Sequence, residues 1–143
     1  MPTRVYAVNM GGFDTHADQV GQHANLLGQL DDAVTAFHRD LATDPRGPEV
    51  MTMIVSEFGR RLPVNANLGT DHGTCIPVLA VGSRVNGGHY GAAPSLTTLD
   101  NQGDPIMTTD FRRVYASVLA DWFKTDPEHV LGAKYETLPV VKA

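Results

Sequence analysis

Several features that are common in other protein classes are scarce in this chain. Its one cysteine, Cys75, leaves no internal disulfide and no zinc site built from several cysteines. No apolar run approaches the ~20 residues that a membrane-spanning helix requires, and residues 1–4 carry no apolar core of a secretory signal. Basic residues are outnumbered, with 11 Lys and Arg against 16 Asp and Glu, and they cluster only in the pairs Arg60-Arg61 and Arg112-Arg113. We therefore expect a soluble protein without a nucleic-acid or membrane partner, in a compartment that the sequence does not specify.

The composition that is present is typical of a globular domain. The chain has 143 residues, of which 42% are hydrophobic and 19% charged, so we expect a single domain over residues 1–143. Local patterns predict a strand over 4–10, a helix over 17–41, strands over 49–56 and 76–81, a helix over 110–123 and a short helical turn over 126–131. This order favours an α/β fold with a partial doubly wound, mostly parallel sheet flanked by helices.

Both long helices have predictable starting points. The first has an apolar stripe at steps of three and four residues within 20–41, and Asp14 or Thr15 is suited to cap it. A threonine at 108 or 109 is suited to cap the second. Between the second and third predicted strands, the polar and glycine-containing segment 65–74 is expected to form a loop.

Ionisable side chains gather at the ends of the predicted strands. In a parallel sheet, ligands bind in the crevice beyond the carboxyl ends of the strands. The side chains that the prediction places at or near that edge are Asp14, His16, Glu57, Arg60, Asp71 and His72. This set is the candidate site.

The segment 69–73, Gly-Thr-Asp-His-Gly, is the sharpest motif of that set. Asp71 and His72 offer an oxygen and a nitrogen ligand for zinc, manganese and similar divalent ions. Adjacent side chains point apart in a regular strand, and the flanking glycines provide the freedom to bring both to one ion. His89 follows within a glycine turn that can return its side chain over the same site.

Each of these residues also has an ordinary structural explanation. Loop aspartates such as Asp71 often form turns, and Asp14 is a good helix cap. Glu57 and Arg60 have the spacing of an ion pair at a strand end. Local spacing alone leaves both readings open.

These motifs, in this order, resemble a bacterial family, the domain of unknown function 1501 (DUF1501). The segments that carry the resemblance are Gly-Gly-Phe-Asp-Thr-His at 11–16, Ser-Glu-Phe-Gly-Arg at 56–60, Gly-Thr-Asp-His-Gly at 69–73, and the segments 87–96 and 108–115. The resemblance implies a relation to the alkaline phosphatase and sulfatase superfamily. It also implies that the chain corresponds to the C-terminal part of a longer member, and such members often carry a twin-arginine signal for export to the periplasm.

The resemblance further implies roles in binding a divalent metal, which would be zinc, manganese, magnesium or calcium. Asp71 and His72 match the Asp-His-Gly motif that ligates one metal of a pair. Asp14 matches an aspartate ligand of the other metal, and His89 corresponds to a later histidine ligand of that second ion. His16 lies near the position expected for a further histidine ligand.

The function that follows is a metal-dependent hydrolase of phosphate, sulfate or related esters, with a small anionic ester as substrate. Arg60 would help to bind the anion, and Glu57 would serve as a base or support a ligand. The resemblance implies that the superfamily's nucleophilic Ser or Thr belongs to strands N-terminal to all of these motifs, and no hydroxyl in this chain matches it.

Two alternatives stay open. One is a non-catalytic metal- or anion-binding fragment that another chain or self-association completes, and for it we expect a homo-oligomer. The other is a promiscuous esterase on a reduced scaffold.

Overall fold

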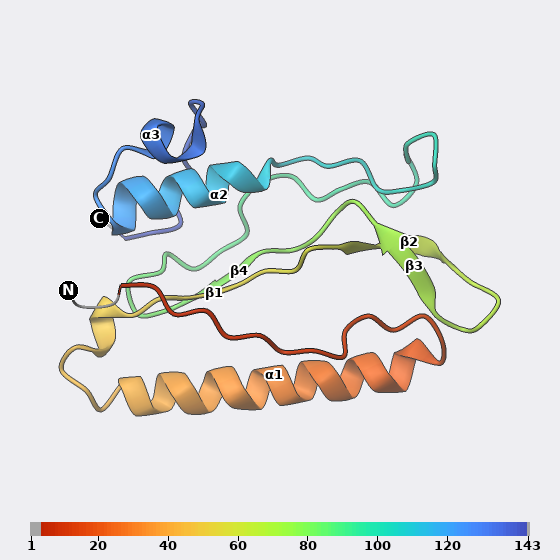
Figure 1. Ribbon diagram of the computed structural model, residues 1–143, viewed down its shortest axis with the longest axis horizontal. Helices are drawn as coiled ribbons and strands as arrows, with labels where there is room; N and C mark the ends of the chain where they lie inside the picture. Colours follow the sequence, from red (N-terminus) through yellow and green to blue (C-terminus); the bar gives the residue numbers. More distant parts are fainter. Residues whose placement is uncertain (1–3, 143) are drawn as a thin grey trace.

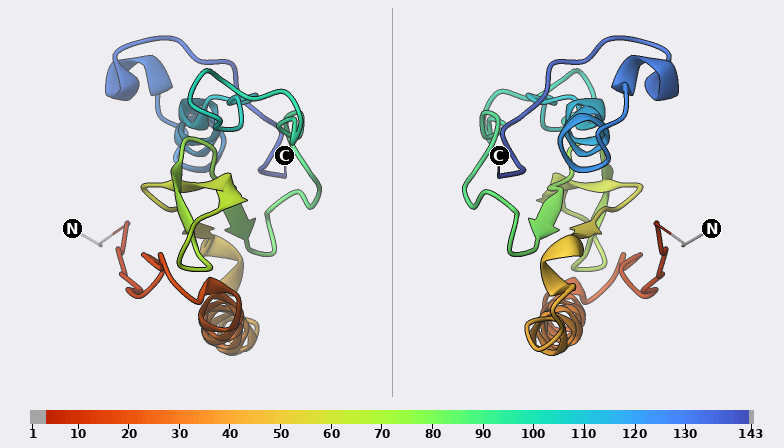
Figure 2. Two further views of the ribbon diagram at one scale, coloured as in Figure 1. Left: turned by 90° about the vertical axis from the view of Figure 1, so that its right-hand side faces the viewer. Right: turned by 90° about the vertical axis from the view of Figure 1, so that its left-hand side faces the viewer.

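The fold is a mixed α/β arrangement built around an antiparallel ribbon. The computed structural model describes residues 4–142. Its strands lie in the middle, with the long helix α1 (Gln19–Leu41) on one side and α2 (Phe111–Ser117) and α3 (Pro127–Leu131) on the other (Figures 1 and 2). The coarse α/β class expected from the sequence is confirmed, but the sheet differs from the expectation.

The ribbon consists of two antiparallel pairs of strands. β1 (Thr52–Ile54) pairs with β4 (Leu79–Val81), and β2 (Gly59–Val64) pairs with β3 (Thr70–Gly73). Both ladders in the described part of the chain are therefore antiparallel, whereas the sequence predicted a mostly parallel sheet. The short connection 65–69 joins β2 directly to β3, and a parallel pair would need a crossover of roughly a dozen residues or more. The chain thus leaves along β1, turns through the β2–β3 hairpin and returns along β4.

The segment 4–10, predicted to be a strand, is extended but pairs with no strand among residues 4–142. It leads toward the β2–β3 hairpin (Figure 1), and Val5, Tyr6 and Val8 are 69%, 81% and 96% exposed. Its β-branched and aromatic composition favours a strand, but a ladder forms only where a neighbouring strand supplies the hydrogen bonds.

The other strands differ from the prediction mainly in length. β1 and β4 are shorter than the predicted strands over 49–56 and 76–81, and a 3₁₀ turn, η1 (Gly47–Glu49), takes the first residue of the first of them. β3 lies inside the segment 65–74 that was expected to be a loop. β2 escaped prediction because its sequence, Gly-Arg-Arg-Leu-Pro-Val, has little apolar alternation.

The long N-terminal helix is confirmed. α1 occupies most of the helix predicted over 17–41, but its N-cap is Asp18, with a left-handed φ of 44° and no side-chain cap, rather than Asp14 or Thr15. No residue of α1 is buried. Its apolar stripe therefore contributes less burial than a helix packed on a full sheet would.

The helix predicted over 110–123 forms as α2 followed by a π-helical turn, η2 (Val118–Trp122). Asp110 caps α2 by accepting a hydrogen bond from a backbone N–H of its first turn, so neither preceding threonine is the cap. The short helix expected over 126–131 is α3.

The small core lies against α2 and η2, where the C-terminal segment folds back. The side chains that form it are Leu138, Val140 and Val141, with Tyr90, Val114 and Trp122 packed around them. The fully buried Ser117 accepts a hydrogen bond from the Leu138 N–H at 2.7 Å, which ties this segment to α2. None of the helices described over residues 4–142 is long and apolar enough to span a membrane.

Candidate metal centre

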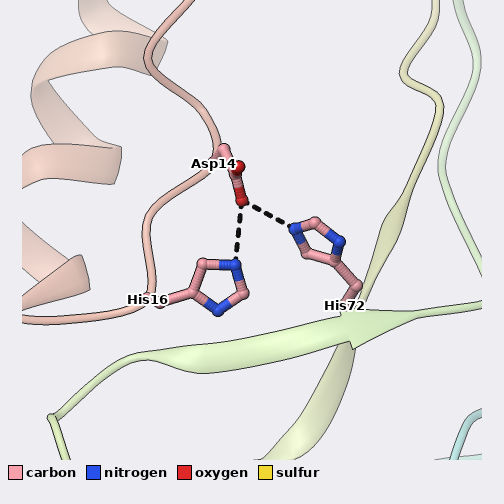
Figure 3. Close-up of side chains that lie close together, drawn as sticks. All are labelled: Asp14, His16 and His72. Carbon is pink, nitrogen blue, oxygen red and sulfur yellow. Dashed lines mark hydrogen bonds and ion pairs between the residues drawn. The ribbon is translucent and has the colours of Figure 1, made fainter.

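Asp14, His16 and His72 lie close together and are called the Asp-His cluster below. The first two come from the loop before α1 and the third comes from β3 (Figure 3). Both imidazoles bond to Asp14 Oδ1 through Nε2, His16 at 2.9 Å and His72 at 2.8 Å. One ligand atom from each of the three side chains lies within 4.8 Å of the others. A single carboxylate oxygen thus joins the loop to the strand.

Asp71 lies at the edge of the Asp-His cluster. Its Oδ1 is 3.6 Å from Nδ1 of His16, the ring nitrogen that does not contact Asp14. Asp71 and His72 are neighbours on β3, where successive side chains point to opposite faces. Only His72 of this pair bonds Asp14, and Asp71 contacts the second nitrogen of His16 instead. The two residues therefore take different places at the site, although the motif presents them together.

The ring of Phe58 supports the Asp-His cluster. It stacks on the His72 imidazole with ring centroids 3.9 Å apart and planes 11° from parallel. The His16 and His72 rings are themselves 4.8 Å apart. These contacts limit the rotation of the His72 ring and hold its Nε2 toward Asp14.

Asn65 is a supporting residue that the sequence prediction missed. Its side-chain NH₂ donates to the His16 carbonyl at 3.1 Å and to Asp71 Oδ1 at 3.2 Å. Its Oδ1 accepts the N–H groups of Asn67 and Gly69, both at 3.0 Å. The sequence signal for it is the turn preference of an asparagine in a glycine-containing loop, and that signal carries no information about the contact with His16.

The loop before α1 is held tightly against the β2–β3 hairpin. Backbone N–H groups at the start of α1 donate to the carbonyls of Asn67 and Leu68, at 3.0 and 3.1 Å. Gly69 lies so close to the His16 main chain that a Cβ atom there would overlap the His16 carbonyl. Glycine at this position therefore permits the approach of the two segments.

Glu57 and Arg60, the predicted catalytic pair, contact different parts of the molecule. Arg60 donates hydrogen bonds to the carbonyls of Phe13 and Thr70. Glu57 is exposed and lines a cavity of about 410 Å³ whose wall also contains Gly73, the last residue of β3, and Phe111. Hydrogen bonds therefore join Arg60 to the two segments that carry the Asp-His cluster, and Glu57 lies on the cavity at the end of β3.

His89 lies in a segment that packs toward the C-terminal core. Its neighbour Tyr90 packs on the buried apolar cluster, and the Asn86 N–H donates to the Val140 carbonyl at 2.8 Å. Among residues 4–142, His89 is not part of the group of potential ligands that converge. Its role as a ligand of a second metal stays a prediction.

The hydroxyl groups near the motifs are engaged in hydrogen bonds. The residues concerned are Thr15, Ser56, Thr70 and Thr74. Thr15 is buried, and its Oγ1 accepts from the Gln19 amide at 3.1 Å.

Hydrogen bonds lower the pKa of both aspartates of the region. The hydrogen bond from His72 is the main cause that lowers the pKa of Asp14, with a smaller contribution from His16. The hydrogen bond from Asn65 is the main cause that lowers the pKa of Asp71. Both carboxyl groups are therefore charged at neutral pH, as metal ligation requires.

The donor set fits a divalent transition metal. Two imidazoles and a carboxylate are typical ligands of zinc and similar ions, and three protein ligands leave a position open for a small molecule. The side chains of Asp14, His16 and His72 are 67%, 45% and 44% exposed, so the cluster is accessible from solvent. A tetrahedral ion needs ligand atoms roughly 3.3 Å apart, so the 2.8–2.9 Å contacts would open by about half an ångström. Exposed side chains can make that adjustment by small rotations.

Of three comparisons with known proteins, the one with protein families gave a match. The comparisons with curated proteins and with solved structures gave none. The family described as "Protein of unknown function (DUF1501)" matches residues 2–134, which is most of the chain and contains every residue of the Asp-His cluster. The chain therefore belongs to the DUF1501 family.

Proposed function

We propose that this protein is a metal-dependent hydrolase of phosphate, sulfate or related esters, with zinc or manganese held by Asp14, His16 and His72. The convergence of one ligand atom from each of these side chains within 4.8 Å carries the proposal. The choice of reaction rests on the resemblance of the motifs to the alkaline phosphatase and sulfatase superfamily. If the chain corresponds to the C-terminal part of such a protein, its strands would belong to a larger, doubly wound sheet.

The surrounding residues have supporting roles in this proposal. Asp71 orients His16 from the nitrogen that is not used for the metal, in the arrangement that ligating histidines usually have with a carboxylate. Asn65 in turn holds Asp71 and the His16 main chain. The two imidazole ligands favour zinc over magnesium and calcium, which prefer oxygen ligands.

A bound divalent ion would act as a Lewis acid toward an ester oxygen and as an activator of water. The chain's own residues bind and orient this ion and leave one side of the site open to a small anionic substrate. Because no hydroxyl in this chain matches the nucleophile of the superfamily, the proposal assigns the nucleophilic role to water.

Metal analysis with a hydrolysis assay tests the proposal. Protein purified without chelators is expected to hold zinc or manganese at near-stoichiometric levels and to hydrolyse p-nitrophenyl phosphate or p-nitrophenyl sulfate. Activity should disappear when the metal is stripped and return when it is added back. Metal content should also fall on acidification, because metal binding requires deprotonated ligands. Protein that takes up no metal at pH ~8 would contradict the proposal.

One observation favours the alternative of a non-catalytic binding fragment that a second copy completes. The extended segment 4–10 exposes Val5, Tyr6 and Val8 and has no strand partner among the described residues. Such a segment promotes pairing with another chain.

Light scattering separates this alternative from a self-sufficient hydrolase. The alternative predicts a dimer or larger assembly that Val8→Asp converts to monomer, because a charge is costly in an apolar contact. The exposed Val130 on α3 provides a matched control, Val130→Asp, which should leave the assembly intact. A monomer that hydrolyses esters would argue against the alternative.

A further inference from the structure

The Asp-His cluster depends on two segments that are distant in the sequence. Asp14 and His16 lie in the loop before α1, whereas His72 lies on β3. The three side chains are exposed, and the stacking of Phe58 on His72 fixes one ring without fixing Asp14 or His16 relative to it. The geometry of the ligands therefore depends on what fixes the loop relative to the strand.

We infer that Arg60 is a positioning residue, whose guanidinium group bonds the loop to β3 and so sets the arrangement of the metal ligands. The inference rests on the proposed metal-binding function. One terminal nitrogen of Arg60 donates to the Phe13 carbonyl at 2.6 Å, and the other donates to the Thr70 carbonyl at 2.5 Å. Phe13 immediately precedes Asp14, and Thr70 lies on the same short strand as His72.

The position of Arg60 on β2 explains how one side chain reaches both segments. Arg60 is the cross-strand partner of His72, so the two side chains leave the ribbon from the same face. The guanidinium carbon lies 5.1 Å from the centroid of the Phe58 ring, the same ring that stacks on His72. Arg60 also donates to Thr15 Oγ1 at 3.3 Å. Arg60 therefore bonds the loop at two residues, Phe13 and Thr15, and the strand at Thr70.

The chemistry of the guanidinium suits this task. A charged donor makes stronger hydrogen bonds than a neutral one, and the planar group presents its N–H donors in a fixed fork. A lysine ammonium is a single point charge and cannot span the two carbonyls in the same way. This role also differs from binding an anionic substrate, because the terminal nitrogens are directed at main-chain oxygens of the protein.

Zinc affinity distinguishes a positioning role of Arg60 from a role in binding an anionic substrate. Arg60→Gln is expected to lower zinc affinity by about 10–100-fold, the usual effect of losing a residue that supports metal ligands, and Arg60→Lys is expected to recover only part of it. Arg113→Gln is the matched control. Arg113 lies on α2 and, like Arg60, donates a hydrogen bond to a main-chain carbonyl, that of Glu136 at 3.1 Å, but it does not touch the Asp-His cluster. The control should keep wild-type zinc affinity even if it lowers the melting temperature. Competition with a chromophoric chelator measures the affinity, and circular dichroism measures the melting temperature.

A second measurement needs no metal. The His16 and His72 rings, with centroids 4.8 Å apart, should give a nuclear Overhauser effect between their ring protons in the metal-free protein. This signal should disappear in Arg60→Gln and persist in Arg113→Gln. If wild-type protein bound no zinc, the proposed function would fail, while the ring-proton signal would still decide the role of Arg60. An Arg60→Gln protein that keeps both the zinc affinity and the ring contact would overturn the inference, as would one that loses only thermal stability.

Discussion

Replacing Asp14 by asparagine is expected to lower zinc or manganese affinity by at least ~100-fold. This is at or beyond the upper end of the ~10–100-fold effect of residues that only support ligands. Asp14 Oδ1 is the atom that both imidazoles contact, at 2.9 and 2.8 Å, and it is the carboxylate of the Asp-His cluster. Asparagine keeps the shape of the side chain but removes the charge that draws a cation. Isothermal titration with zinc, and elemental analysis of the purified variant, measure the loss.

The exposed helix α1 offers a matched control for this substitution. Asp31→Asn removes the same charge from a solvent-facing position on α1 and should leave metal affinity unchanged. If Asp14→Asn bound zinc as tightly as the wild-type protein, the assignment of this aspartate as a ligand would be wrong. Equal losses in both variants would indicate a general effect of net charge instead of a specific ligand.

Replacing Gly69 by alanine is expected to destabilise the fold by about 1–3 kcal/mol, the range typical of overpacking. It should also weaken metal binding by at least ~10-fold. The added Cβ would overlap the His16 carbonyl and crowd the Ala17 nitrogen. These are main-chain atoms that cannot rotate away, so the loop must move from β3. The movement would separate His16 from His72. Urea unfolding and zinc titration measure the two effects.

Gly87 provides the comparison for this prediction. A Cβ at Gly87 would meet no atom within 4 Å, so Gly87→Ala should change neither the free energy of unfolding nor the zinc affinity appreciably. A stable Gly69→Ala protein with normal zinc affinity would show that the close approach of the loop to the hairpin is not required. A variant that is unstable but binds zinc normally would show that Gly69 contributes to the stability of the fold and not to the arrangement of the metal ligands.

Sequence patterns were informative wherever a property is local. The stripe within 20–41 predicted α1, because an amphipathic helix has a repeat that a single segment contains. The segments 11–16 and 69–73 were recognisable as candidate sites, because they combine carboxylate and imidazole groups with glycine. The family resemblance was visible in the same segments and is confirmed over residues 2–134.

Patterns were less informative where a partner segment decides the outcome. The residues 4–10 have the composition of a strand, but without a neighbour among residues 4–142 they form no ladder. β2 and β3 pair through a hairpin with a shifted register, and no alternation of apolar and polar residues in either segment predicts this pairing. The mostly parallel sheet was inferred from the order of elements, and the short connection between β2 and β3 makes that pair antiparallel.

The sequence by itself determined which groups are available for chemistry: a carboxylate and an imidazole two residues apart before α1, and an adjacent carboxylate and imidazole on β3. Only the tertiary structure decided which of these groups contact one another: His72 bonds to Asp14, and Asp71 lies next to Nδ1 of His16. It also decided that Asn65 and Arg60 hold the two segments together. The physical reason is that residue type sets the donors and acceptors locally, whereas their distances depend on hydrogen bonds between segments more than 40 residues apart in the chain.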